Sequence, residues 1–278
     1  PDVTVIAKIG FDHMAILGDT LAKIAAEKAG IIKHGTALVL ESQEKEAMDV
    51  LNKAAERADI KTIKVVNLDE IRILPQKDGK QCFSYAGYDA VTMKMLGVHQ
   101  YENAVAAMLA AELFFEKYFA EKKNVPERKA LQHAIREGID RTQWMGRMEL
   151  VSNDPFFLMD GAHNSNGVEA LKKSLETMYP DEKFHFIMGV MADKDYGEMI
   201  RELLPLALDF KTVTVESERA LQGEALAGCI REKGIPAEAY QNLADVLPDF
   251  SKSSAEKTVA FGSLYFIGEI EAFLQGKQ

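Results

Sequence analysis

The sequence predicts an α/β protein with two domains, because short apolar or β-branched segments alternate with amphipathic helical segments along most of its length. Its 278 residues, 47% of them hydrophobic, are enough to form two ordinary hydrophobic cores. Around residues 140–143 the helical pattern stops, and beyond it strands and helices alternate more regularly. We therefore expect two domains, 1–143 and 144–278, the second built on a mostly parallel, Rossmann-like sheet.

The first half opens with a predicted strand at residues 3–7, which leads into a polar corner. Gly10 lets the chain turn sharply after this strand. The turn leaves Asp12 and His13 at the carboxyl end of the strand, which is where ligands bind in open α/β sheets.

The helix expected at residues 20–30 places a lysine among apolar residues. Positions i, i+3, i+4 and i+7 form one face of a helix, and here they are Leu21, Ile24, Ala25 and Lys28. On one interpretation Lys28 lays its stem on the core and its ammonium group in water. On the other, burial near the site favours the neutral amine. Carbon dioxide could convert that amine to a carbamate, which binds a divalent cation within reach of His13.

The remaining elements of the first half follow from similar patterns. The sequence predicts strands at 37–40 and 63–66, helices at 42–58, 102–119 and 127–138, and an antiparallel ribbon at 71–74, 82–85 and 90–95.

In the second half, short strands alternate with helices of about ten residues, which implies a mostly parallel sheet covered on both faces. Strands are predicted at 148–151, 156–159, 184–188, 210–215, 237–240 and 258–261. Helices are predicted at 167–178, 196–204, 223–233, 243–250 and 264–274.

Charge and cysteine content exclude several classes of protein. The net charge is −10 and acidic and basic residues are mixed, so nucleic acids and anionic membranes are poor partners. Cys82 and Cys229 lie far apart without metal-like spacing, which indicates a reducing compartment. No apolar run approaches about 18 residues and no signal peptide is visible, so we expect a cytoplasmic protein. A core-like strand begins directly after Pro1, and we expect the chain to be part of a longer one.

Two polar positions each allow two interpretations. Asn103 stands at the start of the long apolar helix, where it is a cap or a solvated side chain, or else pairs with the edge of an adenine. Arg147 follows Trp144, the only tryptophan of the chain, near the expected domain boundary. This segment either fills the space between domains or lets Arg147 reach a phosphate, whose oxygens match its planar guanidinium group.

The strand end at residues 158–166 carries a stronger signal, because polar residues at such an end belong to a site more often than to a core. Asp160 can accept hydrogen bonds from ribose hydroxyls, and His163 and Asn164 can bind a carboxylate or a phosphate. A structural role for Asn164 as a helix cap would leave His163 without a function. Ser263, at another strand-to-helix corner, is most simply an N-cap and could line the same cleft.

Several phosphate-binding and catalytic motifs are missing from these residues. The sequence contains no Gly-x-x-x-x-Gly-Lys-[Ser/Thr] loop, no shorter Gly-Lys-Gly loop and no Gly-x-Gly-x-x-Gly. It also contains no Gly-x-Ser-x-Gly elbow and no Cys/His zinc pattern. If the protein handles nucleotide phosphates, the loop that cradles them is not in this stretch.

Together these segments resemble the folylpolyglutamate synthase family of the Mur ligase superfamily. The matching pieces occur in order over nearly the whole chain: Gly10-Phe11-Asp12-His13, Leu17-Gly18-Asp19-Thr20, Glu27-Lys28-Ala29-Gly30-Ile31, His99 with Asn103-Ala104, Trp144 to Arg147, Asp160 to Asn164, Asp193-Lys194-Asp195 and Gly262-Ser263. The resemblance implies the later part of a Mur-ligase-type central ATPase domain followed by a Rossmann-like ligase domain. The family's phosphate loop and another magnesium-binding carboxylate would lie before Pro1, and Met145 stands where the family usually has proline.

The resemblance implies an ATP- and Mg²⁺-dependent ligase that adds L-glutamate to the γ-carboxyl group of a folate through an acyl phosphate, with a monovalent cation as an optional further cofactor. It assigns roles to the following residues: His13 on a magnesium ion, Lys28 as the carbamylated lysine, Asn103 on adenine, Arg147 on the phosphates, Asp160 on the ribose, and His163 and Ser263 near the terminal phosphate or the incoming glutamate.

The resemblance further implies a monomer in which closure about a hinge near Gln143 excludes water from the acyl phosphate. We expect the 278 residues alone to be inactive without the phosphate loop. The alternatives are a dihydrofolate synthase or a bifunctional enzyme that accepts dihydropteroate, a cell-wall Mur ligase, and a nucleotide- or partner-binding module without chemistry.

Overall fold

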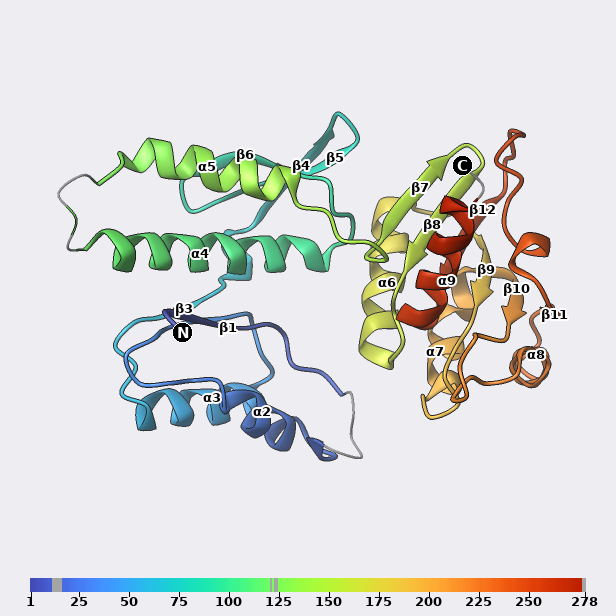
Figure 1. The fold of residues 1–278 in the computed structure, drawn as a ribbon, viewed down its shortest axis with the longest axis horizontal. Coiled ribbons are helices and arrows are strands. Elements are labelled where there is room, and N and C mark those ends of the chain that lie inside the picture. Colours follow the sequence, from blue (N-terminus) through green and yellow to red (C-terminus); the bar gives the residue numbers. More distant parts are fainter. Residues whose placement is uncertain (12–16, 121, 123–124, 277–278) are drawn as a thin grey trace. The chain divides into compact units, whose positions relative to one another are not determined.

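The chain folds into two compact units in the computed structural model, which describes residues 1–11, 17–120, 122 and 125–276 (Figure 1). Unit 1 comprises Pro1–Lys94 and His99–Gln143, and unit 2 comprises Met95–Val98 and Trp144–Gln278. Strands and helices alternate in both units, which confirms the predicted α/β class.

Unit 1 contains a three-stranded parallel sheet in the order β1-β2-β3. Its elements are β1 (Val3–Ile6), α2 (Leu21–Ala29), β2 (Ala37–Leu40), α3 (Lys45–Arg57) and β3 (Ile63–Val65), followed by the short 3-10 turn η1 (Leu68–Glu70). Leu38 and Leu40 point toward α2 and α3, and form a core with Ile24 and Leu51. The parallel register places Ile6 beside Leu40, so that β1 and β2 end at the same edge of the sheet.

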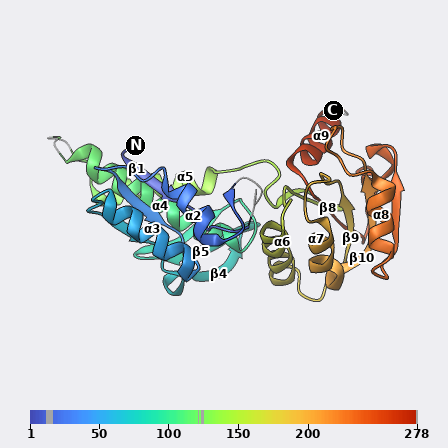
Figure 2. The same cartoon turned by 90° about the horizontal axis from the view of Figure 1, so that it is seen from below.

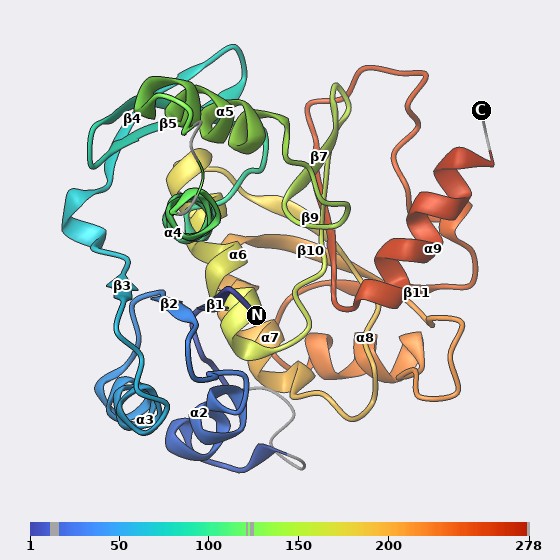
Figure 3. The ribbon, with the colours of Figure 1, turned by 60° about the vertical axis from the view of Figure 1, so that its left-hand side comes forward.

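The other face of this sheet is covered by a long helix that is itself enclosed by a second sheet. The elements are β4 (Arg72–Lys77), β5 (Lys80–Tyr85), β6 (Tyr88–Met93), α4 (His99–Phe119) and α5 (Arg128–Arg141). Figure 3 shows α4 nearly end-on, between the β1–β3 sheet and the layer that contains α5. Val39 of β2, Phe83 of β5 and Val105 of α4 share one core, because α4 carries apolar residues on both sides.

Unit 2 is built on a six-stranded sheet in the order β11-β10-β9-β12-β8-β7, and within the described strands of this sheet only β7 pairs antiparallel to its neighbour. The strands are β7 (Glu149–Asn153), β8 (Phe156–Asp160), β9 (Phe184–Met188), β10 (Ala207–Val213), β11 (Ala237–Tyr240) and β12 (Lys257–Phe261). The helices are α6 (Ser165–Met178), α7 (Tyr196–Leu203), η2 (Leu204–Leu206), α8 (Gly223–Arg231), η3 (Leu243–Asp245) and α9 (Leu264–Gln275).

Successive side chains of a strand point to opposite faces of the sheet, so the apolar residues of unit 2 form two cores, one on each face. Leu158 of β8 faces a core formed with α6, α7 and α8, whereas Phe157 faces a core formed with α9. Figure 2 shows α9 and α6 on different sides of the sheet. Both faces are therefore buried, as the alternation of short strands with helices predicted.

One predicted helix is wrong. The sequence predicted a helix at residues 243–250, but only Leu243–Asp245 form a single 3-10 turn. Pro248 has no N–H group with which to continue a helical ladder, so the amphipathic spacing of this segment does not produce an α-helix.

The connection Met95–Val98 packs with unit 2 although its neighbours along the chain belong to unit 1. Leu96 is 7% exposed and joins the core beneath α6. The main-chain N–H of Val98 donates a hydrogen bond to Ser174 Oγ of α6 over 3.0 Å.

Candidate functional site

At the carboxyl edge of unit 1, side chains that follow β2 hold the main chain that follows β1. Glu41 Oε2 accepts a hydrogen bond from the N–H of Lys8 over 2.7 Å. Gln43 Oε1 accepts from the N–H of Ile9 over 2.8 Å, and Gln43 Nε2 donates to the carbonyl of Ala7 over 2.9 Å. Residues 7–9 are thereby fixed at the edge where the sequence predicted a ligand site.

Two carboxyl groups meet at this edge. Burial is the main cause that raises the pKa of Glu41 to about 7; the N–H of Lys8 acts in the opposite direction, and the nearby carboxylate of Glu102 adds to the rise. Glu102, in the first turn of α4, accepts a hydrogen bond from the N–H of Ser42 over 2.7 Å. Sequence reasoning missed Glu41, although it directly follows a buried strand and so carries the same signal as Asp160.

Lys28 does not lie on the buried face of α2. The buried residues of this helix are Ile24, Ala25 and Ala29, and the side chain of Lys28 is exposed. The prediction that Lys28 shares the buried stripe is therefore wrong, because Ala29 rather than Lys28 continues the face that starts at Ile24. The interpretation that burial favours its neutral amine loses its support. The predicted carbamate remains a prediction.

Of the two predicted magnesium ligands, His13 and Lys28, the structure describes only Lys28. His13 and Asp12 lie outside the described residues. Among the residues that the structure describes, no three His, Cys, Asp or Glu side chains come together as a set of metal ligands.

Asn103 is exposed and lies four residues after the first residue of α4. Its Nδ2 donates to Gln100 Oε1 over 3.0 Å, and Gln100 Nε2 lies 2.9 Å from His99 Nε2. This chain of contacts orients the carboxamide of Asn103 at the N-terminal end of the helix.

In unit 2, Asp160 bonds to the main chain on both sides of its strand end. Its Oδ2 accepts a hydrogen bond from the N–H of Met148 and its Oδ1 accepts one from the N–H of Ala162, each over 2.8 Å. Asp160 is 6% exposed, and this burial raises its pKa to about 6 against the opposing effects of the two N–H groups, Arg147 and His163. Both carboxylate oxygens of Asp160 thus accept hydrogen bonds from main-chain N–H groups.

The segment before β7 is tied to the same corner. The N–H of Gly146 donates to Glu149 Oε2 over 2.8 Å, and the carbonyl of Gly146 accepts from the N–H of Gly161 over 2.7 Å. The side chain of Arg147 passes so close to Gly161 that a Cβ there would lie 2.6 Å from Arg147 Nη1. A Cβ at Gly161 would therefore displace the end of the Arg147 side chain.

His163 and Ser263 stand at the two neighbouring strand-to-helix corners. His163 Nδ1 lies 2.8 Å from the carbonyl of Gly161, and since a carbonyl only accepts, Nδ1 carries the proton. Ser263 caps α9, and its Oγ accepts from the N–H of Phe266 over 3.0 Å, so its predicted N-cap role is confirmed. Asn164 caps α6 in the same way, by accepting from the N–H of Gly167 over 2.8 Å.

The structure brings four of the predicted site residues together at one edge of unit 2. β8 and β12 pair in parallel with Asp160 beside Phe261, and the N–H of Gly262 donates to the carbonyl of Ala162 over 3.0 Å. Arg147, Asp160, His163 and Ser263 therefore share this edge. Lys28 and Asn103 belong to unit 1.

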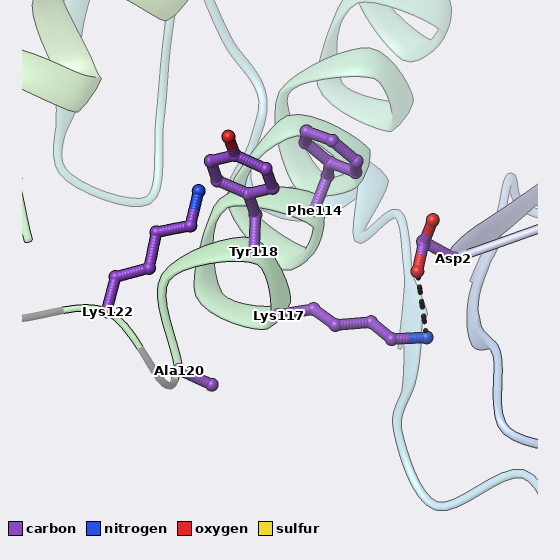
Figure 4. A pocket seen from close by; sticks show the side chains of 6 residues that line it. All are labelled: Asp2, Phe114, Lys117, Tyr118, Ala120 and Lys122. Carbon is purple, nitrogen blue, oxygen red and sulfur yellow. Dashed lines mark ion pairs between the residues drawn. The ribbon is translucent and has the colours of Figure 1, made fainter.

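A cavity of about 620 Å³ opens at the other end of α4 from Asn103 (Figure 4). It is lined by Asp2, Phe114, Lys117, Tyr118, Ala120 and Lys122. The ammonium group of Lys117 pairs with the carboxylate of Asp2 over 3.1 Å, and that of Lys122 lies 3.3 Å from the centre of the Tyr118 ring. Of the predicted site residues that the structure describes, none lines this cavity. In the part of the chain that the structure describes, no helix has the length and apolar character needed to cross a membrane.

Comparisons with known proteins agree with the two units. The Mur ligase middle domain matches residues 1–111, and the Mur ligase glutamate ligase domain matches residues 146–261. The chain is 31% identical to a dihydrofolate synthase/folylpolyglutamate synthase of Bacillus subtilis, over 99% of this chain and 63% of the relative. It is 26% identical to a folylpolyglutamate synthase of Lacticaseibacillus casei, again over 99% of this chain and 63% of the relative.

The fold is also similar to that of a folylpolyglutamate synthase from Mycobacterium tuberculosis solved in complex with ADP. The TM-score is 0.80 at 27% identity, with 98% of this chain and 63% of that chain covered. The chain thus spans 63% of the length of these relatives. The predicted architecture, a middle-domain remainder followed by a Rossmann-like domain, is confirmed. Because two domain models of one family match in order and the fold agrees along nearly the whole length, the chain belongs to the Mur ligase family.

Proposed function

We propose that this chain is part of an ATP-dependent carboxylate–amine ligase that adds L-glutamate to the γ-carboxyl group of a folate, as in folylpolyglutamate synthases. The observation that carries the proposal is the corner at which Arg147, Asp160, His163 and Ser263 meet. This corner lies in a chain that is 31% identical to a dihydrofolate synthase/folylpolyglutamate synthase.

The chemistry needs a leaving group, because an amine does not displace an oxygen of a free carboxylate. ATP supplies it by transferring its terminal phosphoryl group to the γ-carboxylate of the folate. Arg147 provides a planar guanidinium group that binds phosphate oxygens through two parallel hydrogen bonds. His163 would lie near the terminal phosphate or the incoming glutamate, where its imidazole could take up a proton from the attacking amine.

Unit 1 would contribute the adenine and metal contacts. The Nδ2 of Asn103 uses one hydrogen on Gln100, and its second hydrogen and its Oδ1 match the donor and acceptor edge of an adenine. His13 and a carbamylated Lys28 would bind Mg²⁺, and a monovalent cation would be a further ion. The exposed amine of Lys28 is accessible to carbon dioxide. Asp160 would contact the ribose through lone pairs that its main-chain bonds leave over.

We further propose a monomeric, cytoplasmic enzyme whose substrates are a folate or dihydropteroate and L-glutamate. Two relatives support a bifunctional enzyme as the second candidate. The Bacillus subtilis protein and a Mycobacterium tuberculosis protein, each 31% identical to this chain, are both named dihydrofolate synthase/folylpolyglutamate synthase.

The test is a ligase assay on the full-length protein with labelled L-glutamate, ATP and Mg²⁺, comparing tetrahydrofolate with dihydropteroate as acceptor. Label in the folate product supports the first candidate, and label in both products supports the bifunctional enzyme. Transfer only to a nucleotide-sugar peptide would indicate a cell-wall ligase, and no transfer to any acceptor would reject the ligase. We expect the 278 residues alone to show no activity, because their sequence contains no phosphate-binding loop.

A further inference from the structure

We infer that Asp160 is a positioning residue for Arg147: its carboxylate fixes the main chain of Met148 and the end of β8, and so sets where the guanidinium group lies. The inference rests on the proposed function, in which Arg147 binds the phosphates of ATP. It gives Asp160 a role that does not depend on contact with the ribose.

The first step is the tether around Arg147. The main chain on its N-terminal side is held at Gly146, whose N–H bonds to Glu149 and whose carbonyl bonds to Gly161. The main chain on its C-terminal side is held at Met148, whose N–H bonds to Asp160. Arg147 thus lies between two residues whose main chains are held by hydrogen bonds. These bonds fix the direction in which its side chain leaves the main chain.

The second step is the unusual conformation of Met148. This residue has a φ of +46°, is 1% exposed and packs in the core beneath α6. A non-glycine residue in the left-handed region is strained, and this conformation persists only where the surroundings hold it. The buried carboxylate of Asp160 is the group that bonds to the N–H of Met148 in this conformation. Without that bond, the main chain gains by returning to negative φ, which would turn Arg147 away.

The third step concerns the surface on which Arg147 rests. The second oxygen of Asp160 accepts the N–H of Ala162, so the same carboxylate also fixes the turn that contains Gly161. A Cβ at Gly161 would lie 2.6 Å from Arg147 Nη1, and it would also clash with Leu264 Cδ2. One carboxylate therefore fixes both the segment before β7 that carries Arg147 and the strand end across which its side chain lies.

The experiment is a double-mutant cycle in the full-length protein, with nucleotide affinity measured by isothermal titration and KM for ATP from the ligase assay. The carboxamide that D160N introduces can accept only one of the two N–H groups, and we expect ATP to bind at least about tenfold more weakly. We expect R147A to weaken ATP binding by at least as much, and the double variant D160N/R147A to bind no more weakly than R147A alone.

A nucleotide analogue separates positioning from direct contact. Dideoxy-ATP lacks both ribose hydroxyls. If Asp160 acts by positioning Arg147, D160N should weaken the binding of dideoxy-ATP by the same factor as it weakens the binding of ATP. The inference is overturned if D160N binds dideoxy-ATP as tightly as the native protein does. It is also overturned if the affinity losses of D160N and R147A add in the double variant. If R147A itself leaves ATP binding unchanged, the phosphate role in the proposed function fails instead.

A second pair of variants keeps the test independent of whether D160N folds. G161A leaves the carboxylate of Asp160 in place but introduces a Cβ where Arg147 Nη1 lies, and should weaken ATP binding by a similar factor. G268A is the matched control, because a Cβ at Gly268 in α9 meets nothing within 4 Å. Equal ATP affinity of G161A and G268A would contradict the inference.

Discussion

Glu41 Oε2 lies 2.7 Å from the main-chain nitrogen of Lys8, and this hydrogen bond joins the end of β2 to the end of β1 at the carboxyl edge of unit 1. Glu41 is 3% exposed, so its acceptor atom is removed from water. The bond is compatible with a protonated as well as an ionised carboxyl group, because the second oxygen can carry the proton.

The first prediction concerns the pH dependence of Glu41. Its pKa is raised from 4.5 to about 7, so the folded state binds the proton more tightly than the unfolded state does. The stability from this group is fully present below about pH 4.5 and falls as the pH rises to about 7, by roughly 3 kcal/mol in total. E41Q should abolish this fall and be more stable than the native chain at pH 8.

Urea unfolding at pH 5 to pH 8 measures this effect. Glu44 is exposed at the start of α3 and its side chain caps nothing, so E44Q is the control and should follow the native chain at every pH. A constant difference between E41Q and the native chain across this range would contradict the prediction.

The second prediction concerns the aromatic core of unit 2. Phe186 is 0% exposed. The centre of its ring lies 5.2 Å from the centre of the Phe210 ring and 5.7 Å from that of the Phe261 ring. F186A should lower the free energy of unfolding of unit 2 by about 3–5 kcal/mol, because it removes buried area and leaves a cavity. Y265A, at a residue 65% exposed in the same unit, should change it by less than about 0.5 kcal/mol in denaturant titrations.

The third prediction concerns the pair that fastens α5 to the antiparallel sheet. Lys80 Nζ donates to both oxygens of Asp140, over 2.7 and 2.8 Å, and Thr92 Oγ1 donates to one of them over 2.6 Å. D140A should destabilise unit 1 by about 1–3 kcal/mol at neutral pH. The Lys80 and Thr92 bonds lower the pKa of Asp140, so this contribution should be lost as the pH falls below about 4. Thermal unfolding of D140A and the native chain should therefore converge in acid.

The fourth prediction tests the carbamate proposed on Lys28. In the full-length protein K28R should reduce ligase activity at least about a hundredfold, because arginine cannot form the carbamate that replaces an amine hydrogen. Since the side chain is exposed, unfolding free energy should change by less than about 0.5 kcal/mol. K23R, on the same helix and exposed, is the control. Carbon-13 bicarbonate should give a carbamate resonance in the native protein and none in K28R; a fully active K28R would reject the role.

The pattern of apolar residues predicted the helices and strands well where it extends unbroken over many residues. It predicted them less well where a single residue determines the local structure. The nearly continuous apolar runs of β8 and β9 and the long apolar run of α4 indicate buried elements irrespective of their surroundings. The helix at 243–250 failed because Pro248 outweighs the spacing of the apolar residues. The placement of Lys28 failed because a four-residue sample of a helix face does not distinguish its centre from its margin.

The strand-end position of the candidate site residues in unit 2 was predictable, but the hydrogen bonds among them were not. A polar residue after a buried strand located Asp160, and the same rule applied to Glu41 would have found the edge of unit 1. The bond from Met148 to Asp160 was not predictable, because it depends on a positive φ that methionine rarely adopts. The packing of Leu96 with unit 2 likewise depends on a tertiary contact, which local sequence does not encode.

The path of Met95–Val98 has a consequence for dissecting this protein. The polypeptide passes from one unit to the other after Lys94, again after Val98 and a third time after Gln143. A gene fragment that starts at Trp144 therefore omits Leu96, and its product would contain a void where that side chain packs and a Ser174 hydroxyl without its amide donor. An autonomous second unit needs those four residues grafted back, for example through a short linker to Trp144.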